Sequence, residues 1–187
     1  MINNIKLKRK EVLKLTQNEN HKIIPYEEKY LKDAAAIWNE VVEEQNSFPQ
    51  NVPFTETEAD EFFKSQTRTA CLFEDGKMVG IYILHPNSAG NCGHIANCSY
   101  GLTKSARGKG LGRLLVEDSI TEGQKAGFRG IQFNAVVSTN YAAIKLYQRL
   151  GFKILATVPG GFKNPDNTYT DTYIMFRLLT PPCKTSL

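Results

Sequence analysis

A glycine-rich segment between a predicted strand and a predicted helix constrains the fold of this chain most strongly. From Ser105 to Leu115 it reads SARGKGLGRLL, with glycine at positions 108, 110 and 112. Glycine lets backbone N–H groups approach a ligand closely, and the start of a helix adds unpaired N–H groups and the positive end of the helix dipole. Arg107, Lys109 and Arg113 add full positive charges. The segment therefore predicts a turn that binds a pyrophosphate.

Two other phosphate-binding loops do not match this segment. The dinucleotide fingerprint G-x-G-x-x-G needs a wider last spacing than Gly108, Gly110 and Gly112 provide, and a Walker loop ends in Gly-Lys-Ser/Thr, which is not present. The remaining pattern is R-x-x-G-x-G, from Arg107 to Gly112. Taken alone, these six residues are also compatible with an ordinary glycine-rich turn between a strand and a helix.

Length and charge indicate one globular domain with a nearly neutral body. The chain has 187 residues, 41% of them hydrophobic, and a net charge of +4. Residues 1–20 hold five basic and two acidic residues, so most of that charge falls there. We expect a basic N-terminal extension over residues 1–20, a domain over residues 21–179 and a C-terminal tail over residues 180–187. A nearly neutral body argues against nucleic acid as the main partner.

The sequence predicts neither a membrane segment nor a metal site. No apolar run is long enough to cross a bilayer, and the N-terminus lacks the apolar region of a signal peptide. Cys71, Cys92, Cys98 and Cys183 form no C-x-x-C pair and fit no common zinc spacing. Free, mostly buried thiols in a reducing cytoplasm are the expected state, and the expected location is cytoplasmic.

Periodicity and turn residues give an alternating order of elements. Strands are expected at 21–25, 69–74, 77–85, 94–102, 130–137, 153–158 and 168–179, helices at 30–44, after Thr55 to about Ser65, at 111–126 and at 141–150, and a turn-rich loop at 159–167. Asp75-Gly76 is typical of a hairpin turn, which indicates antiparallel pairing. The helix at 111–126 lies between two strands, which indicates a parallel pair. The order predicts a mixed α/β sheet flanked by helices.

A second motif follows the glycine-rich segment after one helix and one strand. Residues 140–152 read NYAAIKLYQRLGF. Together with R-x-x-G-x-G, this segment resembles the two signatures of the GNAT superfamily of N-acyltransferases, in the order in which that family has them. The resemblance implies an α/β (α+β) fold: a mixed, mostly antiparallel sheet of six to seven strands, flanked by about four helices. It also implies a V-shaped splay between strands 94–102 and 130–137.

The resemblance implies an enzyme that moves acetyl from acetyl-CoA to an amine by direct attack, with no metal. A small-molecule amine is the expected acceptor, and a homodimer is a further expectation. A peptide or protein N-acetyltransferase and a non-catalytic acyl-CoA sensor remain alternatives. The cofactor-binding residues that it implies are Tyr100, Leu102, Arg107, Gly108, Lys109, Gly110, Leu111, Gly112, Arg113 and Asn140. Arg107 has the alternative role of stabilising its own loop.

Tyr147 matches the family tyrosine that protonates the departing sulfur. A packing role within the L-Y-x-x-x-G-F motif is the alternative. Many relatives carry a glutamate on the strand before the glycine loop, but residues 94–102 contain no carboxylate. Water relay, His94 or an acceptor amine of low pKa remain possible explanations. Neutralising an amine of pKa about 10.4 at pH 7 costs roughly 4–5 kcal/mol, against about 1.4 kcal/mol for an α-amine of pKa near 8.

Two polar residues interrupt the apolar strands that frame the expected cleft. Asn97 and Asn134 each need hydrogen-bond partners if buried, and a substrate can supply them. The segments GHIAN, ending at Asn97, and FNAV, around Asn134, resemble a GNAT subgroup that includes the fungal acetyltransferase for proline-analogue imino acids. That resemblance implies that both asparagines orient a small substrate. Hydrogen bonding across a strand bulge is the alternative.

Overall fold

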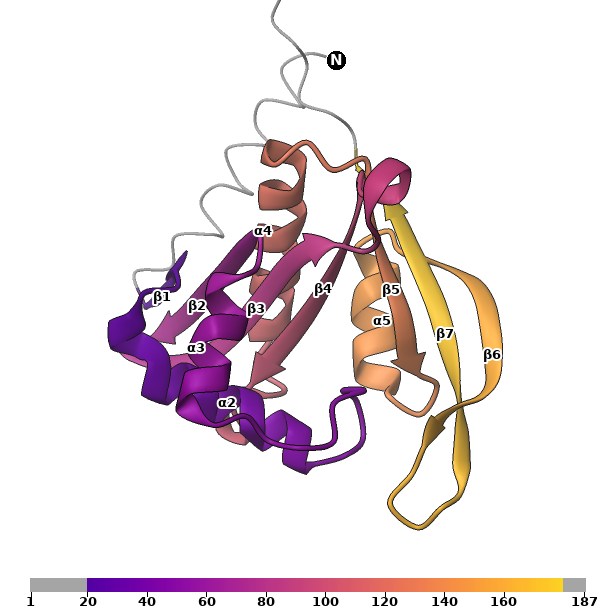
Figure 1. The fold of residues 1–187 in the computed structure, drawn as a ribbon, viewed down its shortest axis with the longest axis horizontal. Coiled ribbons are helices and arrows are strands. Elements are labelled where there is room, and N and C mark those ends of the chain that lie inside the picture. The colour runs from indigo at the N-terminus through magenta and orange to yellow at the C-terminus, as the bar shows by residue number, and fades with distance from the viewer. Residues whose placement is uncertain (1–19, 180–187) are drawn as a thin grey trace, which may run out of the picture.

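The computed structural model describes residues 20–179 (Figure 1). The predicted basic extension, apart from its last residue, lies outside the described residues, as do the predicted C-terminal tail and Cys183. Among residues 20–179, no helix is long and apolar enough to cross a membrane.

One seven-stranded sheet forms the centre of the fold, in the order β1-β2-β3-β4-β5-β7-β6. Its strands are β1 (His21–Pro25), β2 (Arg68–Glu74), β3 (Lys77–Pro86), β4 (Ile95–Leu102), β5 (Gly130–Val137), β6 (Lys153–Lys163) and β7 (Tyr169–Leu178). Only the β4–β5 pair is parallel, and all other neighbours pair antiparallel. The mixed, mostly antiparallel sheet expected from the sequence is confirmed.

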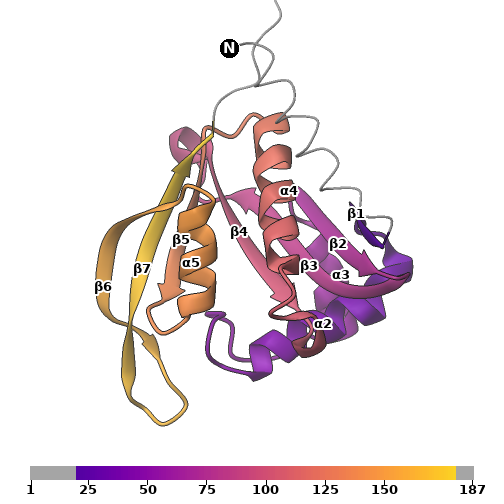
Figure 2. The same ribbon diagram turned by 180° about the vertical axis from the view of Figure 1, so that it is seen from behind.

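Within residues 20–179, four α-helices cover the two faces of the sheet. α2 (Leu31–Glu43) and α3 (Glu56–Lys64) lie on the face toward the viewer in Figure 1. α4 (Leu111–Lys125) and α5 (Tyr141–Arg149) lie on the opposite face, as Figure 2 shows. Three 3-10 turns, η1 (Glu28–Tyr30), η2 (Gly90–Cys92) and η3 (Lys104–Ala106), are the other helical elements in this part of the chain. Each face has its own apolar core, one under α2 and α3 and one under α4 and α5.

Local signals in the sequence set several of these boundaries. Thr55 caps α3 in a full capping box, because its side chain accepts from the Glu58 backbone N–H while the Glu58 carboxylate accepts from the Thr55 N–H. Asp75 and Gly76 take φ values of 50° and 79° in the tight turn between β2 and β3. Gly127 and Gly151 follow α4 and α5 with positive φ.

The parallel strands β4 and β5 pair over a very short length. Their register contains only the pairs Ile95–Gly130 and Ala96–Ile131, at the first residues of both strands. Beyond these pairs the strands separate toward their C-terminal ends, which Figure 1 shows as a widening gap. The N-termini of α4 and α5 lie at the open end of this gap (Figure 2). The V-shaped splay therefore lies between the expected strands.

The prediction of a loop from Pro159 to Asn167 is wrong over its first half. β6 continues to Lys163, with irregular register between Ile154 and Ala156 and between Val158 and Phe162. A bulge absorbs the proline and glycines, and Asp171 on β7 accepts a 2.8 Å hydrogen bond from the Gly160 N–H. Because β6 is an edge strand, the N–H that Pro159 lacks is not needed for pairing with a further strand.

Candidate active site

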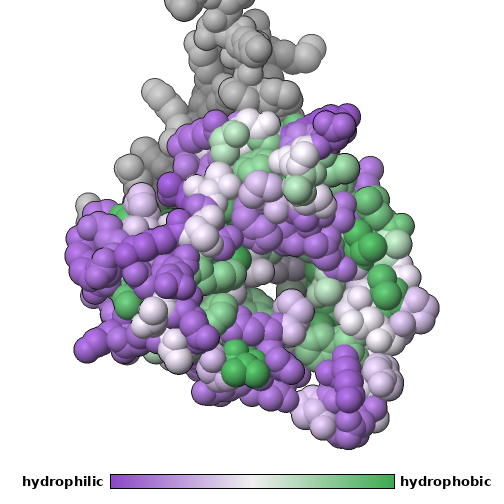
Figure 3. All heavy atoms as spheres, in the orientation of Figure 1, coloured by the Kyte–Doolittle hydropathy of each residue, from purple (hydrophilic) through white to green (hydrophobic). Residues whose placement is uncertain are grey.

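A cavity of about 550 Å³ lies between the two halves of the sheet. Its walls come from the end of α2 and the following loop on one side and from α5 on the other, with β4, β5 and the start of α4 between them. In Figure 3 the surface is hollowed at this place. The polar residues that line it are Glu44, Asn46, Ser47, Asn97, Ser99, Tyr100, Arg107, Asn134, Thr139, Asn140 and Tyr147.

The glycine-rich loop at the N-terminus of α4 has a backbone that suits an anion. Gly108 and Gly110 have φ values of 77° and 83°, which residues other than glycine rarely adopt. A Cβ atom at either position would meet no protein atom within 4 Å. The N–H groups of Leu111 and Gly112, at the start of α4, lack intrahelical acceptors by geometry, whereas the Arg113 N–H donates to the Gly110 carbonyl at 3.0 Å. The loop therefore presents open backbone and free donors, as a diphosphate requires.

Lys109 and Arg113 are exposed cations of this loop. The Lys109 Nζ lies 3.4 Å from a Glu74 carboxylate oxygen, and the Arg113 Nε lies 2.8 Å from Glu117. Exposed ion pairs of this kind contribute little to stability. Both side chains can therefore turn to an anion at low cost.

Arg107 has different partners, within the protein. Its Nη1 donates 2.8 Å hydrogen bonds to both carboxylate oxygens of Glu44, and its Nε and Nη2 donate to the Leu102 carbonyl at 3.1 and 3.0 Å. Burial alone would raise the pKa of Glu44, but Arg107 and Lys104 outweigh it and hold that pKa below its usual value. This geometry fits the alternative role of Arg107, which is to fix its own loop against α2.

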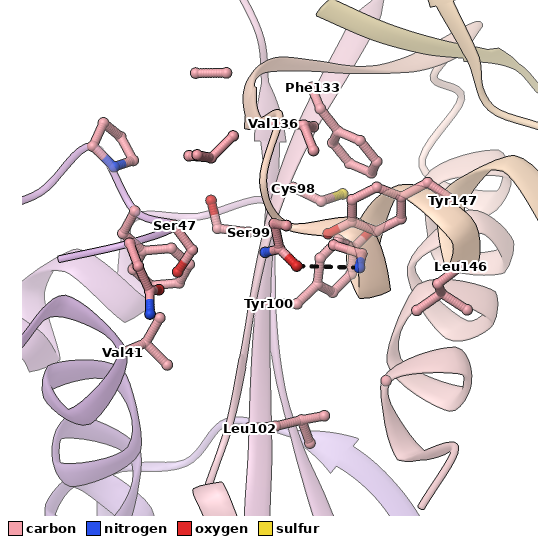
Figure 4. A pocket seen from close by; sticks show the side chains of 18 of the residues that line it. Val41, Ser47, Cys98, Ser99, Tyr100, Leu102, Phe133, Val136, Leu146 and Tyr147 are labelled. Carbon is pink, nitrogen blue, oxygen red and sulfur yellow. Dashed lines mark hydrogen bonds between the residues drawn. The ribbon is translucent and has the colours of Figure 1, made fainter. Parts of the chain in front are cut away.

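Tyr147 reaches from α5 toward β4, beside Cys98 and Tyr100 (Figure 4). Its ring packs 4.5 Å from Phe133 and 6.2 Å from Tyr100, measured between centroids. Burial, and to a smaller extent the neighbouring Cys98, raises the pKa of the Tyr147 phenol. A phenol of raised pKa keeps its proton at neutral pH and can act as a proton donor in the cavity.

Neither Tyr100 nor Cys98, the two neighbours of Tyr147 on β4, is activated for catalysis. The Tyr100 hydroxyl lies 2.8 Å from the Ser119 Oγ on α4, so it already has a hydrogen-bond partner within the protein. Burial raises the pKa of the Cys98 thiol to about 12. This thiol is protonated at neutral pH and is not an activated nucleophile. Of these three residues, Tyr147 is therefore the candidate proton donor.

Asn97 on β4 and Asn134 on β5 come together through a third asparagine. The Asn87 Oδ1, in the loop after β3, accepts hydrogen bonds from the Asn97 Nδ2 at 3.1 Å and from the Asn134 Nδ2 at 2.7 Å. The register of β5 shifts between Phe133 and Val136, which places Asn134 in a bulge that faces the cavity. Both predicted asparagines therefore line one site, and both also belong to a hydrogen-bonded network at a bulge.

Other residues singled out in the sequence have local partners. The Asn140 Oδ1 caps α5 by accepting a 3.2 Å hydrogen bond from the Ala143 N–H, and Asn140 also lines the cavity. Leu102 lines the cavity from β4. His94 is exposed, and its Nδ1 contacts the Asn91 carbonyl at 2.9 Å. It is not among the residues that line the cavity, which argues against a role as the base.

Sequence reasoning missed Glu44 and Asn87. Both come from segments far from the two motifs, and a lone glutamate at a helix end or an asparagine in a polar loop carries no recognisable signal. Within residues 20–179, no three potential ligands group closely enough to hold a metal ion. Cys71 and Cys98 are buried, as expected, while Cys92 is exposed.

Comparison with known proteins identifies the family and agrees with the fold. Residues 35–152 match the acetyltransferase (GNAT) family model. The N-acetyltransferase aca1 of Schizosaccharomyces pombe is 28% identical over 166 residues, 79% of each chain. A GCN5-related N-acetyltransferase from Kribbella flavida superposes with a TM-score of 0.80 at 32% identity, covering 86% of this chain and 99% of that one.

A further solved neighbour contains the expected cosubstrate. The phosphinothricin acetyltransferase of Sinorhizobium meliloti, solved in complex with acetyl-CoA, has a TM-score of 0.80 at 20% identity and covers 89% of this chain and 95% of its own. At this identity the likeness shows the fold alone. The matched family model, which includes both motifs, shows more: the chain belongs to the acetyltransferase (GNAT) family of acetyl-CoA-dependent enzymes.

Proposed function

We propose that this acetyltransferase moves acetyl from acetyl-CoA to a small amine, such as an amino or imino acid. The observation that carries the proposal is the convergence of Asn97 and Asn134 on one side of the cavity. Two amides offer both donors and acceptors, which suits an acceptor that bears an amine and a carboxylate close together.

The charges of the cavity support an acceptor without a second positive charge. Glu44 is the carboxylate among the lining residues, and it is paired with Arg107 at 2.8 Å. A lysine side chain or polyamine would find no unpaired carboxylate among these residues to bind its cation or take its proton. An amine of lower pKa needs less help to become neutral, which favours an α-amino or imino group.

Acetyl-CoA would supply the activated thioester carbonyl. We assign its diphosphate to the backbone of Gly108, Gly110, Leu111 and Gly112, with the side chains of Lys109 and Arg113 beside it. Tyr100 and Leu102 would offer backbone groups of β4 to the pantetheine arm, since β5 does not pair with this part of β4. Tyr147 would give its proton to the leaving sulfur.

A screen of amine metabolites with detection of released thiol tests the acceptor class. We expect turnover with one or more small amino or imino acids and none with lysine side chains of proteins. Acetylation of peptide N-termini alone would contradict the small acceptor and favour a peptide N-acetyltransferase. Binding of acetyl-CoA without any turnover would favour an acyl-CoA sensor.

Replacing Asn97 with alanine tests the amide site directly. We expect Asn97→Ala to raise the KM for the amine at least about tenfold, because one hydrogen bond to a charged group is worth about 1.5–3 kcal/mol. The KM for acetyl-CoA should stay unchanged. Asn91→Ala is the control, since Asn91 is exposed and is not among the lining residues. Equal KM values for both variants would make Asn97 a structural residue only.

The homodimer expected from the sequence stays a prediction, and so does the cytoplasmic location. Exposed apolar side chains on the edge strand β6 and its neighbour β7 support self-association, among them Leu155 at 60% and Leu178 at 58% exposure. Sedimentation equilibrium measures the mass in solution, and a monomer at all concentrations would contradict the prediction.

A further inference from the structure

We propose that Asn87 is the positioning residue that fixes the amide groups of Asn97 and Asn134 for the amine acceptor. The inference rests on the proposed function, and it adds a residue that lies outside both motifs. It also assigns a role to the loop between β3 and β4.

Asn87 joins three separate segments of the chain with one side-chain atom. Its Oδ1 accepts from the Nδ2 of Asn97 on β4 and from the Nδ2 of Asn134 on β5, at 3.1 and 2.7 Å. Its own backbone N–H donates to the Ile95 carbonyl at 2.8 Å, which fastens the loop to the first residue of β4. The backbone of Asn87 is therefore anchored independently of the two amide groups that its side chain holds.

The three asparagines lie where backbone pairing between the parallel strands stops. The last register pair of β4 and β5 is Ala96–Ile131, and Asn97 and Gln132 come next on their strands. From there a chain of side chains crosses the gap, because the Gln132 Nε2 donates to the Asn134 Oδ1 at 2.9 Å, and Asn134 and Asn97 both donate to Asn87. Amide side chains thus continue the contact that the backbone no longer makes.

This chain of hydrogen bonds sets the directions of the amide donors and acceptors that face a substrate. A free asparagine amide rotates about χ2 and exchanges its carbonyl and NH₂ ends, because that torsion has a broad, roughly two-fold profile. Once one N–H of each amide is bound to Asn87, the directions of its remaining donor and acceptor are set before the substrate arrives. Ordering side chains in advance lowers the cost of binding. Loss of Asn87 should therefore weaken amine binding through both asparagines at once.

The test compares Asn87→Leu in two backgrounds, using the best amine from the screen. Leucine has a similar size and no acceptor. In the otherwise unchanged enzyme we expect the amine KM to rise about tenfold, with the KM for acetyl-CoA unchanged. In the Asn97→Ala/Asn134→Ala background, Asn87→Leu should cause no further rise, since the groups that it holds are gone. A tenfold rise in both backgrounds, or in neither, would overturn the proposal.

A second variant keeps the test decisive if the leucine variant folds poorly. A carboxylate accepts both hydrogen bonds, so Asn87→Asp should keep the amine KM within about threefold of the unchanged enzyme. The methyl ester of the best amino acid is the probe here, because it carries no carboxylate for the new charge to repel. A tenfold rise of the amine KM with Asn87→Asp would show that accepting these two hydrogen bonds is not the role of residue 87. This result also overturns the proposal.

The outcomes separate this inference from the proposed function. If the unchanged enzyme acetylates a small amine and the two backgrounds show no difference, only the role of Asn87 is wrong. If it acetylates peptide N-termini alone, the small-acceptor proposal is wrong. The same comparison, made with that peptide, then decides the role of Asn87.

Discussion

Gly110→Glu is expected to abolish acetyl-CoA binding, with the Kd raised at least about 100-fold, equivalent to roughly 2.7 kcal/mol. Gly110 has a φ of 83°, and a side chain there would project into space that no protein atom occupies within 4 Å. We assign that space to the diphosphate, so a glutamate would fill it and repel the anion. Isothermal titration calorimetry with acetyl-CoA measures the loss.

Gly127→Glu is the matched control for this substitution. Gly127 has a φ of 85°, and a Cβ atom there would also meet no protein atom within 4 Å. It follows the C-terminal end of α4, whereas Gly110 precedes the N-terminal end. The two variants therefore share the same kind of backbone strain and the same added charge, but the control variant should still bind acetyl-CoA. Equal loss in both variants would assign the effect to folding, and normal binding by Gly110→Glu would mean that the diphosphate binds elsewhere.

Tyr147→Phe is expected to lower kcat about 100-fold or more, in the range typical of general acid catalysis. The KM for acetyl-CoA should change little, because the ring and its packing against Phe133 remain. Steady-state kinetics with both substrates separate these effects. An unchanged kcat would leave Tyr147 with a packing role only.

Tyr100→Phe is the control, since the Tyr100 hydroxyl is already bound to Ser119. Its removal should cost about 1 kcal/mol of stability, as loss of one hydrogen bond does, and leave kcat nearly unchanged. A similar fall in kcat for both variants would indicate a general effect on the aromatic cluster.

The pH dependence of kcat follows from the direction of the pKa shift at Tyr147. Burial raises this pKa, so the phenol keeps its proton at higher pH than a tyrosine in water. The donor is therefore present at neutral pH and would be lost only above the ordinary phenol pKa of about 10. We expect kcat to rise as the amine loses its proton, with no alkaline decline below about pH 10.

Most of the fold could be predicted because local chemistry determines its boundaries. Thr55 with Glu58, the Asp75-Gly76 turn and Gly127 each fix an end of an element by their own backbone or capping needs. The error at Pro159-Gly160-Gly161 has a tertiary cause. Residues typical of turns remain in β6 because Asp171 on the neighbouring strand binds the bulged backbone.

The residues of the candidate site that belong to a motif within one segment could be predicted from the sequence. The glycine loop and Tyr147 follow from motifs, and Asn97 and Asn134 stood out as polar residues within apolar strands. The partners of these residues were not predictable, since contacts between distant segments place Glu44 opposite Arg107 and Asn87 between the two asparagines. Local patterns do not encode such contacts.

The short parallel ladder makes the cleft sensitive to small changes at its closed end. From Ala96 to Leu102, β4 runs for about 20 Å at the usual rise per residue. If the two strands act as rigid arms, a rotation of about 3° at the Ala96–Ile131 pair moves their far ends apart by about 1 Å, a misplacement that can cost a large factor in rate. Substitutions at this pivot can therefore tune the distance between the two reactants without touching either of them.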